Sequence, residues 1–249
     1  MKKIVINNVN ASSKKDNEKL LYDLNLEIKE NEFIAVIGSS GSGKTSFFNL
    51  IINELKILSG NIFFNNKNYF DFNKKEIKSF KQSVGYLNQK PNLLYEEDVY
   101  HNIKKFYNLQ TNNFFKLFNI ITQKDFDFIK GILKQFLIED FIFTPVSNLS
   151  GGQQQRVEIA KLLIKKSQII LADEPTTGLD YKTSETVLKS LKTLSQLQKT
   201  ITLVNIHDLS LISDKYFSRV IAFKKGRIAL DISIDQFNLK TIKEKKIYE

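Results

Sequence analysis

The sequence contains no cysteine, no tryptophan and only three prolines among its 249 residues. Without cysteine the chain can form no disulfide, no thiolate nucleophile and no cysteine-based zinc site, and it suits a reducing compartment. It also lacks any apolar run that approaches the roughly 18 to 20 residues needed to span a bilayer. We therefore expect any membrane role of this protein to require a partner chain.

Acidic residues are outnumbered by basic ones, with 27 Asp and Glu against 37 Lys and Arg and a net charge of +10. Such a charge is compatible with a nucleic-acid partner or an anionic membrane face. However, the lysines are scattered and accompanied by many Asn, Ile and Phe residues. This pattern favours a general Lys/Asn bias and a solvated basic surface.

The first residues resemble the charged start of an export signal, because two lysines follow Met1. Asn7, Asn8 and Asn10 then interrupt the chain before any apolar signal segment forms. We therefore expect that the protein is not exported.

The most informative stretch is the glycine-rich segment 38–45, which separates an apolar run at 33–37 from a helical pattern at 45–52. Its spacing, G-x-x-x-x-G-K-[ST], allows backbone N–H groups and the next helix N-terminus to face one anion. We expect a nucleotide polyphosphate there, with Lys44 on the β- and γ-phosphates and the Thr45 hydroxyl on Mg²⁺. A flexible Gly/Ser turn is the alternative. The residues expected to bind the nucleotide here are Gly38, Ser39, Ser40, Gly41, Ser42, Gly43, Lys44, Thr45 and Ser46.

Hydrophobic patterns predict an alternating α/β chain. Alternate apolar positions at 3–9 and 20–28 predict half-buried antiparallel strands. The continuous apolar runs at 33–37 and 169–172 are typical of parallel strands that are buried on both faces. Further strands are expected at 60–66, 84–88, 200–206 and 220–223, and helices at 182–197 and after His207. The polar tail at 235–249 supports no clear prediction.

Residues 93–147 differ from the rest, because they are rich in Phe and Ile with roughly helical spacing. The series Phe126, Ile129, Ile132, Leu133, Phe136 and Leu137 indicates an all-helical insert. Its aromatic residues can form either a docking face for a membrane partner or a small core, and sequence leaves both open. These aromatic residues are Phe106, Tyr107, Phe114, Phe115 and Phe118.

Other polar residues stand where predicted strands end or helices begin. Gln89 ends the strand at 84–88, and His207 ends the strand at 200–206. Asp173 and Glu174 follow the buried strand at 169–172, at the sheet edge where ligands of open α/β sheets bind. Ser150 begins a helix as its N-cap, within the sequence LSGGQQQR at 149–156.

The chain resembles the ATP-binding subunit of an ABC transporter, because it carries five features of that family in a fixed order. These features are GSSGSGKT, Gln89, LSGGQQQR, ILADEP and His207. The segment 149–153 is the most discriminating, because ordinary phosphate-loop NTPases lack it, and the resemblance extends to about Leu230. It implies a single ABC ATPase domain of the α/β class with a P-loop NTPase core. Residues 1–92 and 148–249 would form this core with an N-terminal antiparallel β subdomain, and 93–147 an inserted α-helical subdomain.

The resemblance also implies a homodimer that sandwiches two ATP molecules, each between the phosphate loop of one chain and the 149–153 segment of the other. The free N–H groups and partial positive charge of the helix after Ser150 suit a γ-phosphate presented by that partner. Residues implied to act at this second half of the site are Ser150, Gly151, Gly152, Gln153 and Asp180.

The resemblance assigns catalytic roles to three residues. Glu174 would act as the general base on the attacking water, and His207 would contact the γ-phosphate. Gln89 would sense metal and water and transmit the nucleotide state to the helical insert. Mg²⁺ would be held by Thr45, Asp173 and Gln89. The other histidine, His101, is expected to be structural.

One feature of the family is missing, namely the aromatic residue that stacks on adenine soon after the first strand. Residues 9–13 offer no aromatic side chain at that place. Either Tyr22 substitutes for it or the site has no good stacking residue, and we favour the second interpretation. Such stacking is worth roughly 1 to 3 kcal/mol per base in nucleic-acid sites, used here as a proxy.

Within the family, the single nucleotide-binding unit, the QQQR ending and the sequence LVNIHD at 203–208 look most like importer ATPases of the phosphonate type. The implied solute is a phosphonate, an organic phosphate or a vitamin such as thiamine. The implied partners are an integral-membrane permease and an extracytoplasmic solute-binding protein, at the cytoplasmic face of the cell membrane. The alternatives are a regulatory or mechanical ABC ATPase at a membrane complex and a soluble nucleic-acid-associated ABC ATPase. No nucleic acid is expected, because those relatives carry tandem units or a long coiled-coil insert.

Overall fold

The computed structural model describes residues 2–108 and 123–248, and within them the larger sheet has six strands in the order β10-β9-β3-β8-β7-β6. The pairs β6–β7, β7–β8, β8–β3 and β3–β9 are parallel, and β10 is antiparallel to β9. The strands are β3 (Phe33–Ile37), β6 (Val84–Leu87), β7 (Ile169–Asp173), β8 (Ile201–Asn205), β9 (Arg219–Lys224) and β10 (Arg227–Ser233). All residues of β3 and β8 are buried, as continuous apolar runs predict.

A smaller antiparallel sheet has the order β2-β1-β4-β5. Its strands are β1 (Lys3–Ser12), β2 (Lys19–Lys29), β4 (Lys56–Phe64) and β5 (Lys67–Asn68). The predicted strands at 3–9 and 20–28 are present but longer, and a bulge shifts the pairing of β1 with β4 between Asn7 and Asn10. Gly60 lies opposite this bulge with φ of +83°, and a Cβ there would lie 2.4 Å from the carbonyl oxygens of Asn7 and Asn8. Only glycine fits this close backbone approach.

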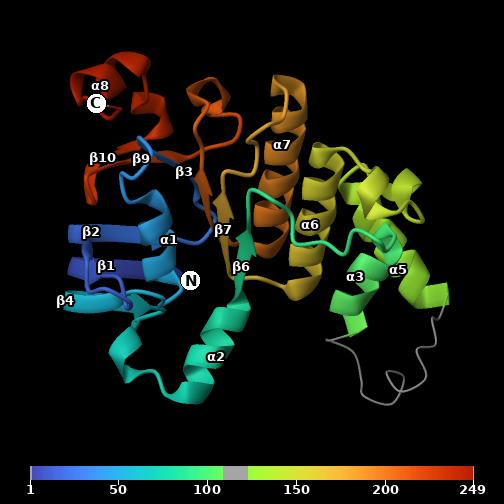
Figure 1. Ribbon diagram of the computed structural model, residues 1–249, viewed down its shortest axis with the longest axis horizontal. Coiled ribbons are helices and arrows are strands. Elements are labelled where there is room, and N and C mark those ends of the chain that lie inside the picture. Colours follow the sequence, from blue (N-terminus) through green and yellow to red (C-terminus); the bar gives the residue numbers. More distant parts are fainter. Residues whose placement is uncertain (1, 109–122, 249) are drawn as a thin grey trace.

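Helices cover both faces of the larger sheet, and Figure 1 shows the antiparallel strands at one end of the molecule and α3 and α5 at the other. The helices are α1 (Lys44–Ile51), α2 (Lys74–Ser83), α3 (Val99–Asn108), α5 (Gln123–Gln135), α6 (Gly151–Lys165), α7 (Tyr181–Gln198) and α8 (Leu239–Glu244). No helix among the described residues is both long and apolar enough to cross a membrane.

Strand β3 shows how the chain divides its core between two hydrophobic clusters. Phe33, Ala35 and Ile37 belong to the cluster that contains residues of α6 and α7, whereas Ile34 and Val36 belong to the cluster that contains residues of α1. Successive side chains of a strand point to opposite faces, so this single strand packs against both layers. The central sheet is therefore covered by apolar side chains on both faces.

Two sequence expectations were wrong, and the tail without a prediction is ordered. The helix expected after His207 is a single 3₁₀ turn, Leu209–Leu211, because the Asp208 side chain accepts from the backbone of Ser210. Leu137 is 65% exposed and lies beyond the end of α5 with φ of 55°. The polar tail contains α8 and buries Ile242 and Ile247 in the core.

Sequence left open whether the aromatic residues of the insert form a docking face or a small core. Their side chains lie outside those that the structure describes, namely Phe106, Tyr107, Phe114, Phe115 and Phe118.

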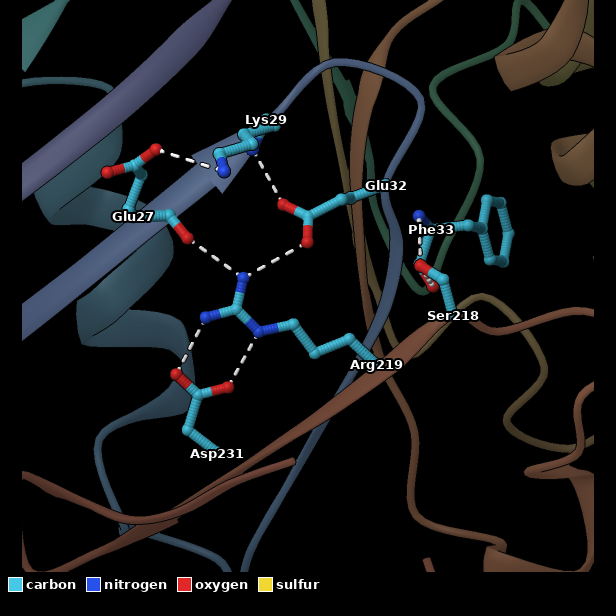
Figure 2. A network of polar contacts seen from close by, with 7 residues as sticks. All are labelled: Glu27, Lys29, Glu32, Phe33, Ser218, Arg219 and Asp231. Atoms are coloured by element: carbon cyan, nitrogen blue, oxygen red, sulfur yellow. Dashed lines mark hydrogen bonds and ion pairs between the residues drawn. The ribbon is translucent and has the colours of Figure 1, made fainter. Parts of the chain in front are cut away.

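Arg219 on β9 ties the two sheets together, as Figure 2 shows. Its guanidinium donates two hydrogen bonds to Asp231 of β10, at 2.6 and 2.7 Å. It also donates to the Glu27 carbonyl of β2 at 2.8 Å and to the Glu32 carboxylate at 3.1 Å. The two carboxylates raise the pKa of Arg219 above its ordinary value. A single side chain therefore fixes β2, β9, β10 and the turn before β3 in one arrangement.

Candidate active site

The phosphate loop, residues 38–45, connects the carboxyl end of β3 to the start of α1. Gly43 precedes α1 with φ of 110°, a backbone conformation that suits glycine. No side chain caps this helix, and its first turn contains no acidic residue. The N–H groups at the start of α1 are therefore available to an anion, whose charge the helix dipole also stabilises.

Lys44 is nearly buried, with 5% of its surface exposed. Its ammonium donates to the carbonyl oxygens of Gly38 at 2.7 Å and Ser39 at 2.9 Å. Burial lowers the pKa of Lys44, and the nearby carboxylates of Glu174 and Asp173 partly oppose this shift. The loop thus holds a desolvated cation beside two carboxylates from another strand.

A pocket of about 280 Å³ opens above this loop. It combines residues from four separate parts of the chain, which are the start of β2, the phosphate loop, the residue after β7 and the region after β8. Its lining residues are Leu20, Ser40, Gly41, Gly43, Lys44, Thr45, Ser46, Glu174 and His207. The larger sheet therefore brings the predicted phosphate loop, Glu174 and His207 together.

Asp173 ends β7 and is held by three neighbours. Its carboxylate accepts hydrogen bonds from Asn205 Nδ2 at 2.6 Å, Tyr86 Oη at 3.2 Å and Thr45 Oγ1 at 3.3 Å. Burial and the carboxylate raise the pKa of Tyr86, so its hydroxyl stays protonated and donates. Sequence reasoning missed Tyr86 and Asn205. Asn205 could have been found from the sequence, because it is a polar residue at the end of a wholly buried strand.

Glu174 points to a different set of partners, because its backbone turns through φ of 53°. Its Oε1 lies 2.6 Å from Nε2 of His207, and its Oε2 accepts from the Thr177 hydroxyl at 3.3 Å. The two neighbouring carboxylates are thus separated, with Asp173 beside Thr45 and Glu174 beside His207. Thr177 is a further residue that sequence reasoning missed.

Gln89 lies beyond the end of β6 and lines an adjoining pocket of about 320 Å³ with Asp173 and Glu174. Asn88 and Lys90 complete that lining. The backbone carbonyl of Gln89 accepts from Gln155 at 2.8 Å, whereas its own side chain is exposed. The structure therefore places Gln89 next to both carboxylates.

The oxygen donors around Asp173 fit Mg²⁺ bound together with a nucleotide. Among the residues that the structure describes, no group of three or more His, Cys, Asp or Glu side chains forms a metal cluster. Mg²⁺ normally uses one or two carboxylates, water and substrate phosphate oxygens in place of an all-protein cage. The Thr45 hydroxyl and the Asp173 carboxylate, 3.3 Å apart, match that donor set.

The segment 149–153 and Asp180 form a second cluster. Ser150 and Gln153 exchange hydrogen bonds in a capping box at the start of α6, at 2.7 and 3.3 Å. Asp180 caps α7 by accepting from Thr183, whose hydrogen bonds lower the pKa of Asp180. A Cβ on Gly152 would lie 2.2 Å from a methyl group of Thr183, so the two helix starts are in close contact.

This second cluster does not meet the first within one chain. Among the described residues, none that lines the phosphate-loop pocket belongs to 149–153, and Asp180 does not line it either. The capped start of α6 leaves its Gly151 residue exposed to solvent.

Tyr22 and His101 lie outside the Lys44 pocket. The Tyr22 hydroxyl donates to the Lys19 carbonyl at 3.0 Å, and its ring lies 4.6 Å from the Lys19 ammonium and 5.3 Å from the Arg227 guanidinium. Of the residues near Tyr22 in the sequence, Leu20 lines the Lys44 pocket. His101 Nδ1 lies 2.8 Å from Asp98 in the first turn of α3.

Comparison with known proteins places this geometry in a family. The ABC transporter family profile matches residues 21–177. A probable ABC transporter ATP-binding protein p29 of Mesomycoplasma hyorhinis is 36% identical over 214 residues, which cover 86% of this chain and 85% of that protein. The phosphonates import ATP-binding protein PhnC of Lactococcus lactis subsp. cremoris (strain SK11) is 37% identical over 215 residues, covering 86% of each chain.

Solved structures agree. CbiO1 from Clostridium perfringens, part of the ABC transporter complex cbiONQ, superposes with a TM-score of 0.80 at 28% identity and covers 98% of this chain and 92% of its own. The ATP-binding cassette MJ0796, in a dimeric post-hydrolysis state with ADP and Pi, gives a TM-score of 0.74 at 30% identity, covering 94% of this chain and 100% of its own. Sequence, fold and site therefore agree that this chain belongs to the ABC transporter family, as an ATP-binding and ATP-hydrolysing subunit.

Proposed function

We propose that this chain hydrolyses Mg-ATP in a composite site between two copies and couples that reaction to solute import through a membrane permease. The observation that carries the proposal is the convergence of Lys44, Glu174 and His207 on one pocket. The relatives named for phosphonate import support a phosphonate or related organic phosphate as the solute.

The phosphate loop would bind the triphosphate through its backbone N–H groups and Lys44. In this role Lys44 exchanges the carbonyl oxygens of Gly38 and Ser39 for oxygens of the β- and γ-phosphates. Because the ammonium is desolvated, its attraction to phosphate is stronger than it would be in water. The other expected contacts of the loop are Ser39, Ser40, Gly41, Ser42, Gly43, Thr45 and Ser46.

Mg²⁺ would be held by Thr45 and Asp173, with Gln89 reaching the metal or its water. When bound, it neutralises charge that develops on the transferred phosphoryl group. Asn205 and Tyr86 orient the Asp173 carboxylate toward Thr45.

Glu174 would accept a proton from the attacking water, and its side chain is already oriented by His207 and Thr177. His207 would then contact the γ-phosphate, where a ring N–H stabilises developing negative charge. The short Glu174–His207 contact keeps the base and the phosphate-binding histidine side by side.

The second half of each site would come from a partner copy. Ser150, Gly151, Gly152 and Gln153 present the positive end of α6, and Asp180 lies beside them at the start of α7. Within the part of the chain that the structure describes, this cluster contains no phosphate loop, and no residue of 149–153 lines the Lys44 pocket. A homodimer that joins the two surfaces would supply both halves, and the similar cassette MJ0796 is also a dimer.

We assign 93–147 as the helical subdomain and 1–92 with 148–249 as the catalytic core and β subdomain. Within the helical subdomain, the side chains of Leu94, Tyr95 and Phe143 are 48%, 44% and 64% exposed. We infer that this apolar surface contacts the permease, with an extracytoplasmic solute-binding protein delivering solute on the other side. The chain would then lie at the cytoplasmic face of the membrane.

The direct test is ATP hydrolysis by site variants. Glu174→Gln is expected to abolish turnover but retain ATP, because it removes the base and preserves the contacts to phosphate. Lys44→Ala is expected to weaken ATP binding or turnover strongly. Glu54→Gln, a change to an exposed carboxylate that pairs with Lys81 on the surface, serves as the control and should hydrolyse ATP normally.

Normal hydrolysis by Glu174→Gln or Lys44→Ala would contradict the assigned roles. Solute class is tested separately, with the chain and its permease in vesicles. A phosphonate, an organic phosphate and thiamine are compared as stimulators of ATP hydrolysis.

A further inference from the structure

The segment between β6 and α3 comprises residues 88–98, and its first part, residues 88–92, is held to α6 through backbone carbonyl groups. Gln89, Lys90, Asn92 and Leu94 are all exposed. The segment forms no helix or strand, so its backbone polar groups need other partners. Several of those partners are buried side chains of α6 and α3.

Helix α6 contributes two donors to this segment. Gln155, which is 3% exposed, donates from Nε2 to the carbonyl oxygens of Gln89 at 2.8 Å and Asn88 at 3.3 Å. Two turns further along, the Lys161 ammonium donates to the Asn92 carbonyl at 2.6 Å. From the other side, Asn102 of α3 donates to the Leu94 carbonyl at 3.0 Å.

Lys161 belongs to a buried ion pair with Glu158, whose oxygen lies 3.0 Å from the ammonium. Their side chains are 3% and 9% exposed. Burial raises the pKa of Glu158, against the opposing effects of Lys161 and of a hydrogen bond from the Asn92 backbone. The pair thus contacts both polar groups of the Asn92 peptide backbone. A buried ion pair seldom stabilises a fold more than apolar residues would, so we look for its role in the contacts that it makes with the Asn92 backbone.

We propose that Gln155, Glu158 and Lys161 are positioning residues, which fix the backbone of residues 88–92 to α6 so that Gln89 moves with the helix that begins at Ser150. This inference rests on the roles proposed above for Gln89 and Ser150. An α-helix is a stiff element over its fifteen residues, and here the same helix carries Ser150 at its start and the three positioning side chains along one face. Engagement of nucleotide at Ser150 would therefore reorient Gln89 directly.

The test is the double variant Glu158→Leu/Lys161→Met, which replaces the pair by apolar residues and leaves no buried charge alone. The expected result is a fall in kcat of about tenfold or more with unchanged KM for ATP, because catalytic groups tolerate little displacement. Lys165→Met is the matched control. Lys165 lies on the same helix and also faces Glu158, but its ammonium donates to the Val84 carbonyl of β6 at 2.6 Å, outside the segment. Its replacement therefore changes the charge near Glu158 without removing the donors to residues 88–92, and kcat should persist.

Two further variants separate positioning from a general structural effect. Gln155→Leu removes the donor to Gln89 without touching the ion pair, and it should lower kcat in the same way. Lys161→Arg keeps a cation with several donors and should retain most of the wild-type kcat. Thermal unfolding of each variant shows whether it is folded at the assay temperature.

The decisive comparison repeats the double variant in a Gln89→Ala background. If the pair acts through Gln89, its replacement there should cause no further fall in kcat. Independent, multiplying losses would overturn the inference but leave the proposed function intact. Unchanged kcat in Gln89→Ala alone would overturn both the role of Gln89 and this inference. Unchanged kcat in both Glu158→Leu/Lys161→Met and Gln155→Leu would also overturn the inference.

Discussion

Asp173 and Glu174 are adjacent in the sequence, yet they face different partners. The reason is local, since Glu174 takes a positive φ of 53° and turns its side chain toward His207. A non-glycine residue in this conformation costs on the order of 1 to 3 kcal/mol, and such strain tends to occur at functional sites. The conformation separates the carboxylate proposed to bind Mg²⁺ from the one proposed to act as the base, in two consecutive residues.

Tyr86 offers a test of how Asp173 is oriented. Tyr86→Phe removes the hydroxyl that donates to Asp173, so the carboxylate should hold Mg²⁺ less well. Loss of such an outer-shell partner typically costs about 10- to 100-fold in metal affinity or activity. We expect the Mg²⁺ concentration for half-maximal ATP hydrolysis to rise by about tenfold, measured by titration of the metal.

Tyr69→Phe is the matched control for this titration. Tyr69 is also buried, and its hydroxyl donates to the Ile51 carbonyl at 3.0 Å, away from the pocket. Its removal should leave the Mg²⁺ dependence unchanged. Equal shifts in both variants would show that Tyr86 acts on stability and not on Asp173.

Sequence reasoning found the site residues that follow strands but missed the residues that hydrogen-bond to them from neighbouring strands. Gln89, Asp173 and His207 each stand at or directly after the carboxyl end of a predicted strand, and the phosphate loop follows the strand at 33–37, so topology alone brings them to one edge of the sheet. Asn205 pairs with Asp173 through the parallel register of β7 and β8, and Tyr86 reaches it from β6. Strand order and register were not known from one sequence, so these contacts could not be predicted.

The buried Glu158 gives a prediction about pH. Because its folded pKa is raised above the ordinary 4.5, it binds more protons in the folded chain than in the unfolded one. The free energy of unfolding should therefore fall with rising pH from 4.5 through the raised pKa, relative to Glu158→Gln. The charged groups that face this carboxylate are Lys161 and Lys165. Denaturant unfolding of the wild-type protein and of Glu158→Gln across this pH range measures the difference between their free energies of unfolding. A difference that does not change with pH would contradict the prediction.

At the scale of elements, long apolar patterns predicted the strands well. The strands at 33–37 and 169–173 have the bounds expected to within one residue, because both are buried on both faces. The sequence reasoning did not predict α2 and β10, and it found only the second half of β4. The first half of β4 was not predicted because the bulge opposite Gly60 interrupts the alternation of apolar and polar residues. Helix α2 was not predicted because only Phe80 of its ten residues is buried. The capping box of Asn73 and Glu76 at the start of α2 was a sequence signal from which this helix could have been predicted.

The Arg219 network leads to a prediction about stability. Arg219→Leu leaves Asp231 and Glu32 without their cation and removes the link to β2. We expect the free energy of unfolding to fall by about 2 to 3 kcal/mol, which corresponds to a melting temperature lower by about 4 to 12 °C. Differential scanning calorimetry measures both quantities.

Arg227→Leu is the matched control, because it breaks another arginine–aspartate contact between strands. Arg227 and Asp23 are 55% and 57% exposed, so this pair should contribute less than about 1 kcal/mol. A loss of stability as large as that of Arg219→Leu would contradict the importance of burial at Arg219.

At the scale of the whole molecule, the two clusters of the site lie on separate parts of one chain. The Lys44 pocket contains the residues assigned to bind phosphate and activate water, whereas Ser150 and Asp180 form their own cluster at the starts of α6 and α7. Each cluster is incomplete alone if the assignment is correct. Catalysis should therefore depend on two chains, each of which contributes one cluster to each site.

The most direct measurement is complementation between two inactive variants. Lys44→Ala destroys the phosphate loop of one chain, and Ser150→Arg blocks the α6 start of another, so neither protein alone should hydrolyse ATP. In an equimolar mixture, the intact loop of the Ser150→Arg chain can pair with the intact Ser150 of the Lys44→Ala chain. The account predicts that the mixture hydrolyses ATP well above either variant. A mixture as inactive as its components, with wild-type protein active under the same conditions, would contradict it.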